Sequence, residues 1–328
     1  MTVHTLHNFH WQPRLITQLA CIKACLEYLG REISYPWLYG GTAYAFVLNV
    51  HQTLEPSGPD CWGTEPIFEL AINLGCKVNG ISIDKVEAGD SYPIVQRQAW
   101  DFVRSSLDNG LPCYGWEVQP YIPGYNTIHG YDDGEQGGYL YAGWGSDGIR
   151  DWRTLGEIDV QRLEVYRVEL VEPATAVKTV KDALAAVIEH SATSSGWYSH
   201  PEYASGPAGF DLWAEAVETG RAIRDGHSYN AAAWLECREM AVEFFKEAHQ
   251  RLPGRADAAF SDAEARYAEV CDLLRTMLAC HPFHLETWDN ETKLQSAEVA
   301  DLLRQAGKAE RQGLSNLSTI VKALHEEV

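Results

Sequence analysis

Apolar residues recur at every third and fourth position through most of the second half of the chain. This spacing gathers them on one face of an α-helix, which is typical of helices that pack on one another. The helices predicted in this way cover 178–190, 211–225, 228–251, 261–280 and 293–326. They follow a break at Glu172-Pro173-Ala174-Thr175. We therefore expect an all-α domain over residues 173–328.

The first half, residues 1–172, mixes helical periodicity with short strand-like runs. Helices are predicted over 17–29, 64–74 and 94–108, with Thr17 as the N-cap of the first helix and Gly30 as its stop. Strands are predicted over 111–118, 125–131, 139–142 and 163–170, the second and third forming a hairpin. Helices that precede an antiparallel sheet indicate an α+β domain.

Charge and composition exclude some classes of binding partner. Lys and Arg number 26 against 46 Asp and Glu, so the net charge of −20 repels nucleic acid and an anionic membrane surface. No apolar run approaches the about 20 residues that cross a bilayer. The N-terminal segment has neither the basic start nor the apolar core of a secretion signal, so we expect a soluble cytoplasmic protein. Its eight cysteines are then expected to be thiols. Nothing in the sequence indicates an oligomeric state.

Two segments carry a resemblance to a known fold. One is ITQLACIKACLEYLG, and the other is DNGLPCYGW followed by IHGYDDGEQGGYLY. Together they resemble the papain-like fold, and in particular the butirosin-biosynthesis H protein N-terminal family and the bacterial papain-like peptidases that process double-glycine leaders. The resemblance covers about residues 10–172. It implies a papain-like helix-plus-antiparallel-sheet domain in front of the helical domain.

The resemblance also implies a reactive site. In such a site a cysteine opens the helix, a histidine on the sheet takes its proton, and a glutamine stabilises the oxyanion. The matching positions hold Thr17 for the nucleophile and Gln12 for the glutamine. The base would fall at Gly124 or Tyr125, and the residue that orients it within 142–144. None of these positions except Gln12 carries the expected side chain.

Other residues become candidates if the nucleophile and the base lie a few residues further along the helix and the strand. Cys21 lies four residues beyond Thr17, and His129 lies four or five residues beyond the expected base. Four helical residues advance about 6 Å but four strand residues about 13 Å, so a joint shift does not keep the two groups at one distance. Cys21 is also typical of a core thiol. Asp132 is a further candidate, although its place in Gly-Tyr-Asp-Asp is typical of a turn.

Aromatic residues near the predicted sheet indicate a pocket. Its expected walls are Trp116, Tyr125, Tyr131 and Trp144. A packed interface between the two domains would explain the same residues. The triplet His4, His7 and His10 has a spacing that would suit zinc, but no helix signal or carboxylate partner supports it. We therefore expect no metal and no cofactor.

Two functional hypotheses remain from the sequence. The first is an acyl-transfer or amide-bond-cleaving enzyme on a small-molecule or aminoacyl substrate, with Cys21 as nucleophile, His129 as base and Gln12 as oxyanion donor. The second is a catalytically inactive papain-like scaffold that acts as a small-ligand-binding or accessory protein. The resemblance favours the first hypothesis, and the residues at the matching positions favour the second.

Overall fold

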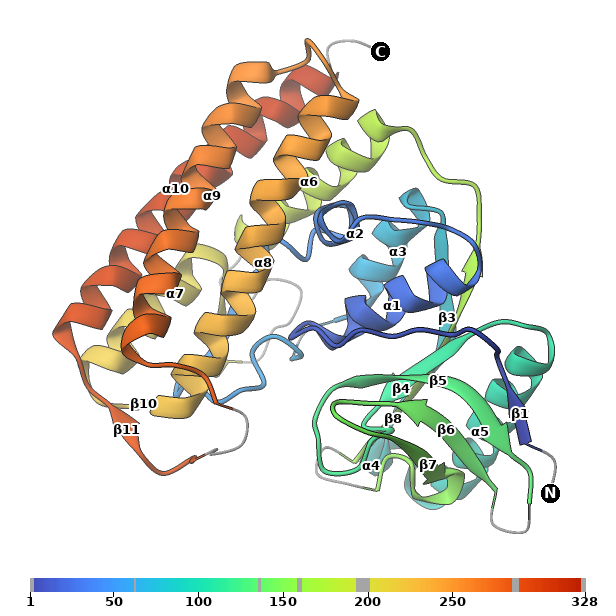
Figure 1. Cartoon of the computed structure of the whole chain (residues 1–328). Coiled ribbons are helices and arrows are strands. Elements are labelled where there is room, and N and C mark those ends of the chain that lie inside the picture. The colour runs from blue at the N-terminus through green and yellow to red at the C-terminus, as the bar shows by residue number, and fades with distance from the viewer. Residues whose placement is uncertain are drawn as a thin grey trace. The chain divides into compact units, whose positions relative to one another are not determined.

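The chain forms two compact units (Figure 1). The structure is a computed structural model that describes residues 3–61, 63–134, 137–157, 161–192, 201–284 and 289–325. Unit 1 comprises Met1–Ile33 and Gly75–Glu172, and unit 2 comprises Ser34–Leu74 and Pro173–Val328. Unit 1 holds an antiparallel sheet with helices and unit 2 is mainly helical, so the chain is a mixed α+β protein, as predicted.

The sheet of unit 1 has seven strands within the described residues, in the order β3-β8-β4-β5-β6-β7, with β1 paired to β5. All of its pairings are antiparallel. The strands are β1 (Val3–Thr5), β3 (Cys76–Asp84), β4 (Cys113–Trp116), β5 (Tyr125–Asp132), β6 (Gly138–Ala142), β7 (Asp147–Asp151) and β8 (Arg162–Leu170). The four predicted strands are confirmed, whereas β1, β3 and β7 were not predicted.

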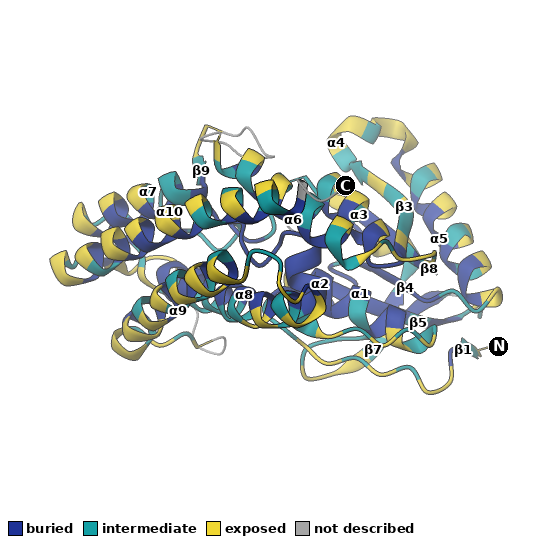
Figure 2. Cartoon of the chain, turned by 90° about the horizontal axis from the view of Figure 1, so that it is seen from above, coloured by how far each residue is buried: buried dark blue, intermediate teal, exposed yellow. Residues whose placement is uncertain are grey.

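Helices cover both faces of this sheet. Helix α5 (Tyr92–Asp108), which follows the single turn α4 (Lys85–Ala88), packs against one face and buries Trp100 and Val103 with Ile128 and Val165. Helix α1 (Thr17–Tyr28) contacts β4, β5 and β8, and Figure 2 shows it mostly buried. Successive strand residues point to opposite faces of the sheet, and α5 and α1 cover opposite faces. The strands therefore present alternate residues to α5 and to α1.

A β-bulge divides β5 into two parts. The pairing of β5 with β6 shifts register between Ile128 and Gly130. One extra residue reverses the alternation of side chains, so Tyr131 joins Ile128 in the core under α5. Without the bulge, Tyr131 would share a face with Tyr125. The bulge therefore determines which aromatic residues of β5 face α1.

Unit 2 is built from long helices that pack along one another. They are α6 (Ala176–Ala192), α7 (Gly206–Glu218), α8 (Arg224–Arg251), α9 (Asp257–Cys280) and α10 (Ala297–His325). Helix α10 packs on α9 and α7, and α8 packs on α9. The predicted helices are confirmed, except that the one predicted over 211–225 ends at Glu218 and the one predicted from 293 begins at Ala297. Two short strand pairs complete the unit, β2 (Asn49–His51) with β9 (Tyr203–Ser205) and β10 (Ala222–Ile223) with β11 (Lys293–Leu294).

The segment 34–74 belongs to the helical unit, although the sequence analysis placed it in the first domain. It contains α2 (Tyr35–Gly41) and α3 (Glu65–Asn73), joined by a largely buried stretch. Arg238 of α8 donates to the backbone oxygens of Ala45 at 3.3 Å and Val47 at 2.7 Å. The guanidinium also pairs with Glu310 of α10 at 2.8 Å, with both side chains at most 1% exposed. Buried carbonyls need such donors, and α8 supplies them.

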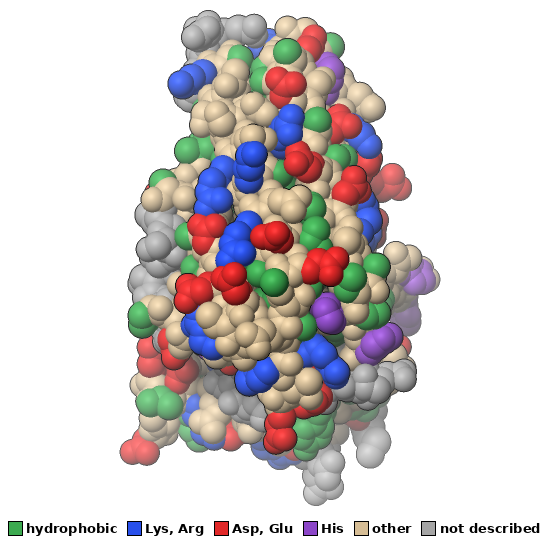
Figure 3. Space-filling view, turned by 90° about the vertical axis from the view of Figure 1, so that its left-hand side faces the viewer, with side chains coloured by type: hydrophobic (Ala, Val, Ile, Leu, Met, Phe, Trp, Pro, Cys, Tyr) green, Lys and Arg blue, Asp and Glu red, His purple; other side chains and the backbone are tan. Residues whose placement is uncertain are grey.

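Charges on the helical unit are mixed in sign. Figure 3 shows basic and acidic side chains interspersed over one face. Ion pairs such as Arg304–Glu218 and Arg311–Asp211 link α10 to α7. The net negative charge is therefore not gathered into one patch on this face. Among the described helices, none combines the length and the apolar run that a bilayer crossing requires.

Glu310→Gln tests the buried ion pair. The change leaves the Arg238 charge buried and without its counter-ion, which costs about 3–5 kcal/mol in comparable cases. Urea denaturation followed by helical circular dichroism should show that loss in the free energy of unfolding. Glu218→Gln, which breaks an exposed pair with Arg304, should cost less than about 1 kcal/mol. Equal effects of the two changes would contradict the role given to Arg238.

Two buried histidines make unit 2 sensitive to acid. Burial lowers the pKa of His190 to about 4 and that of His227 to about 3. An unfolded chain takes up these protons near pH 6.5, so the free energy of unfolding falls as the pH drops from about 6.5 toward 4. His227→Gln should reduce the loss between pH 7 and pH 5, measured by urea denaturation. The exposed control His284→Gln should lose as much free energy of unfolding between pH 7 and pH 5 as the wild type. If His227→Gln loses as much as the wild type, His227 does not contribute to the acid sensitivity.

Candidate functional site

The first helix and strand β5 begin at the same place. The backbone amide of Tyr125 donates to Thr17 Oγ1 at 2.8 Å in a buried environment. The neighbouring Gly124 has φ +132°, and a Cβ built there would lie 3.0 Å from the same oxygen. The positions that the resemblance assigns to the nucleophile and the base are therefore adjacent. One carries a hydroxyl that accepts a backbone hydrogen bond, and the other carries no imidazole.

The start of α1 lacks a side-chain cap. The N-cap residue is Ile16 and not Thr17 as predicted, no side chain caps the helix, and its first turn holds no acidic residue. The Thr17 side chain, 6% exposed, is engaged with Tyr125. The positive end of the helix dipole therefore lies here with neither a side-chain cap nor an acidic residue in the first turn.

Gln18 is the residue that the sequence analysis missed. It is the second residue of α1 and 3% exposed, and its Nε2 has no hydrogen-bond partner among the described residues. Gln12, the predicted oxyanion donor, is instead exposed in an irregular segment before the helix. The signal available in the sequence was the position of Gln18 directly after Thr17.

Cys21 has none of the properties of an activated thiol. It lies one turn beyond Thr17 and is completely buried. Burial raises its pKa well above the ordinary value, although the indole of Trp11 acts in the opposite direction. A thiol that stays protonated and out of contact with solvent is a poor nucleophile. The geometry thus argues against Cys21 as the reactive residue.

His129 lies further along β5 and is not engaged with Cys21 by any contact that the structure describes. Desolvation lowers its pKa, an effect that Asp147 partly offsets, and its Nδ1 is buried without a partner among the described residues. Its ring stacks on Phe9 at a centroid distance of 6.1 Å. Asp132 Oδ1 accepts from the amide of Gly134 at 2.9 Å, which is the interaction of a turn residue. His129 and Asp132 are therefore not assembled into a catalytic pair.

The aromatic residues of the predicted pocket divide between the two faces of the sheet. Trp116 and Tyr125 are cross-strand neighbours with ring centroids 5.1 Å apart. Tyr131 packs on the other face, where its hydroxyl donates to Asp108 at 2.6 Å. Trp144 lies in the turn after β6, and its carbonyl accepts from Gln119. A single pocket walled by all four residues is therefore not formed, because the bulge in β5 turns Tyr131 away.

A buried carboxylate lies beyond Tyr125 and was not predicted. The hydroxyl of Tyr125 donates to Glu164 Oε2 at 2.5 Å, and Arg162 pairs with the other carboxylate oxygen at 2.6 Å. Burial and the carboxylate together raise the pKa of Tyr125 well above its usual value. Tyr125 is consequently a protonated hydrogen-bond donor with an occupied hydroxyl, and it cannot serve as a base at neutral pH.

Metal binding has no assembled ligand set in the described residues. Within them, no three His, Cys, Asp or Glu side chains come together in a way that could hold an ion. Of the predicted histidine triplet, His4 belongs to β1 and stacks on Tyr131 at 5.3 Å. This contact gives His4 a packing role.

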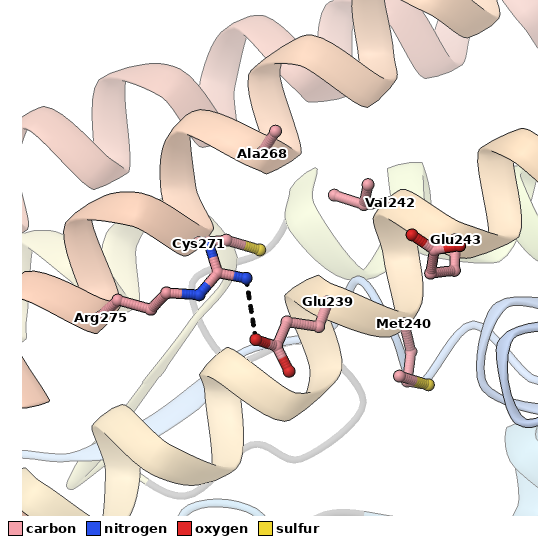
Figure 4. A pocket seen from close by; sticks show the side chains of 7 residues that line it. All are labelled: Glu239, Met240, Val242, Glu243, Ala268, Cys271 and Arg275. Carbon is pink, nitrogen blue, oxygen red and sulfur yellow. Dashed lines mark hydrogen bonds and ion pairs between the residues drawn. The ribbon is translucent and has the colours of Figure 1, made fainter.

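A separate shallow pocket of about 320 Å³ lies between α8 and α9 in unit 2 (Figure 4). Its lining includes Met240, Ala268 and Cys271, and an ion pair at 2.8 Å joins Arg275 to Glu239 across it. Burial raises the pKa of Cys271 to about 12. The carboxylate and the guanidinium already satisfy each other, and the thiol is not activated. This pocket therefore offers no evident chemistry.

No family model matches this chain, and no curated protein matches it.

Thiol labelling tests the description of Cys21. Six of the eight cysteines are buried, Cys61 is partly exposed and Cys280 is exposed. At pH 7, iodoacetamide should modify Cys280 first. The rate at Cys21 should be at least about a hundredfold lower, because the buried thiol reacts only when the structure around it opens. Peptide mass spectrometry over time gives the order. Labelling of Cys21 as fast as Cys280 would contradict the inert thiol, and Cys280→Ser checks that the fast phase belongs to Cys280.

Proposed function

We propose that this protein is a catalytically inactive papain-like scaffold that binds a small ligand at the start of α1 and acts as an accessory protein. The observation that carries the proposal is the hydrogen bond of 2.8 Å from the Tyr125 amide to Thr17 Oγ1. It joins the two positions at which a papain-like enzyme would hold its nucleophile and its base. Neither position carries a group that performs that reaction.

The arrangement of the elements supports the papain-like part of the proposal. A helix begins against the start of a strand within an antiparallel sheet, and the helix follows the strand from there. Thr17 at one end of α1 meets Tyr125. Tyr28 at its other end packs on Phe9, which in turn stacks on His129. This relation between helix and sheet supports a papain-like arrangement.

The acyl-transfer hypothesis finds less support in the same geometry. It requires a thiolate next to an imidazole, and burial favours the protonated thiol of Cys21. It also requires a base, and the residue beside Thr17 is Tyr125, whose hydroxyl is bound to Glu164. A threonine hydroxyl without an adjacent base is a weak nucleophile. Binding without turnover is the function that these residues support best.

Binding has a physical basis at this place. Trp116 and Tyr125 form an aromatic wall beside the uncapped start of α1. Aromatic rings provide contact area, and the helix amides provide polar recognition. A small molecule with an apolar body and a polar group would satisfy both.

A thioester assay tests the proposed function. The purified chain is incubated with S-phenyl thioacetate, and thiophenol release is followed by absorbance. We expect the rate to equal that of the Cys21→Ala variant, because no thiolate is available to attack. Turnover that Cys21→Ala abolishes would contradict the proposal and restore the enzyme hypothesis. Native mass spectrometry of the same preparation should reveal any small molecule that co-purifies with the folded chain.

A further inference from the structure

We infer that the ligand of this site is a small organic carboxylic acid, whose carboxylate accepts hydrogen bonds at the start of α1. The inference rests on the proposed function and names the chemical class of its ligand. It follows from the kind of polar groups that lack partners at this place. They are hydrogen-bond donors, so the missing group must be an acceptor.

Two side chains next to the helix start carry unpartnered donors. The Nε2 of Gln18 is buried in a residue that is 3% exposed, and it has no partner in the described part of the chain. The indole Nε1 of Trp116 is also buried and unpartnered there. Gln18 belongs to the first turn of α1, and the Trp116 ring packs on Tyr125, whose amide binds Thr17. Buried donors without partners are rare and require an explanation.

The backbone adds donors of the same sign. No side chain caps α1 and no acidic residue lies in its first turn. The start of a helix carries the positive end of its dipole, which favours an anion. An indole nitrogen can only donate a hydrogen bond. An ammonium group brought to this place would meet donors and the positive end of the dipole, so an amine ligand is disfavoured.

The carboxylate bound to Tyr125 does not fill this role. Glu164 accepts from the hydroxyl of Tyr125 and pairs with Arg162, so its oxygens are engaged at the other end of the tyrosine side chain. An external carboxylate would supply two oxygens to Gln18 and the helix start. The rings of Trp116 and Tyr125 would contact an apolar body attached to it. These features together favour an organic acid over an inorganic anion.

Three probes with one body separate the head groups. Phenylacetate, phenylacetamide and phenethylamine are titrated into the full chain by isothermal calorimetry at pH 7. We expect saturable binding of phenylacetate, at least about tenfold tighter than that of the other two, since hydrogen bonds to a charged acceptor are the stronger ones. Equal or tighter binding of the amide or the amine would overturn the inference.

Two variants assign the binding to the donors. Gln18→Met removes the amide at similar length, and Trp116→Phe removes the indole N–H. Each should weaken phenylacetate binding about tenfold or more. Gln98→Met, at an exposed position of α5, is the matched control and should bind as the wild type does. Circular dichroism checks folding, and if Gln18→Met does not fold, Trp116→Phe decides.

The failures of the two proposals are distinguishable. No saturable phenylacetate binding by the wild type, or undiminished binding by a folded Trp116→Phe, would overturn the carboxylate inference alone. Thioester turnover dependent on Cys21 would overturn the proposed function, whichever probe binds.

Discussion

The contact between the Tyr125 amide and the Thr17 hydroxyl determines what the first helix can do. It joins the helix to the sheet at the residue where each begins, in surroundings that leave Thr17 6% exposed. A buried amide without an acceptor costs about 1–3 kcal/mol, so the threonine satisfies a real demand of the strand. Thr17 is the first residue of the helix and Ile16 is its N-cap, so no side chain caps the first-turn amides of α1. The two positions therefore do not form a nucleophile and a base, and the start of α1 keeps hydrogen-bond donors for a ligand.

Cys21 and His129 do not form a reactive pair, because helix α1 and strand β5 rise by different distances per residue. A helix advances about 1.5 Å per residue and a strand about 3.3 Å, so groups shifted equally from a shared starting point separate. Thr17 and Tyr125 mark that starting point, and Cys21 and His129 lie four residues beyond it on their elements. Burial then raises the pKa of the thiol and lowers that of the imidazole. Burial therefore favours the neutral form of both groups; Cys21 packs in the core and the His129 ring stacks on Phe9.

Much of the fold could be predicted because periodicity reports burial directly. The long helices of unit 2 were found from apolar spacing, and helix α1 from that spacing together with Gly30 as its stop. The bulge in β5 was not, since one extra residue leaves no mark in composition, and it moved Tyr131 out of the expected pocket. Thr17 was predicted as a cap from its residue type, but the helix begins one residue earlier than expected and the Thr17 oxygen accepts from a distant backbone amide. Residues 34–74 join the helical unit through partners far away in the sequence, such as Arg238, and apolar spacing does not report such contacts.

Amide hydrogen exchange at Tyr125, read by NMR, probes the joint between helix and strand most directly. In the wild type this amide should exchange slowly, at a rate comparable with that of Ile128 in the same strand. Thr17→Val removes the acceptor while keeping the shape, so exchange at Tyr125 should accelerate about tenfold or more while Ile128 stays protected. Fast exchange at Tyr125 in the wild type, or no change in Thr17→Val, would show that α1 and β5 do not meet in this way.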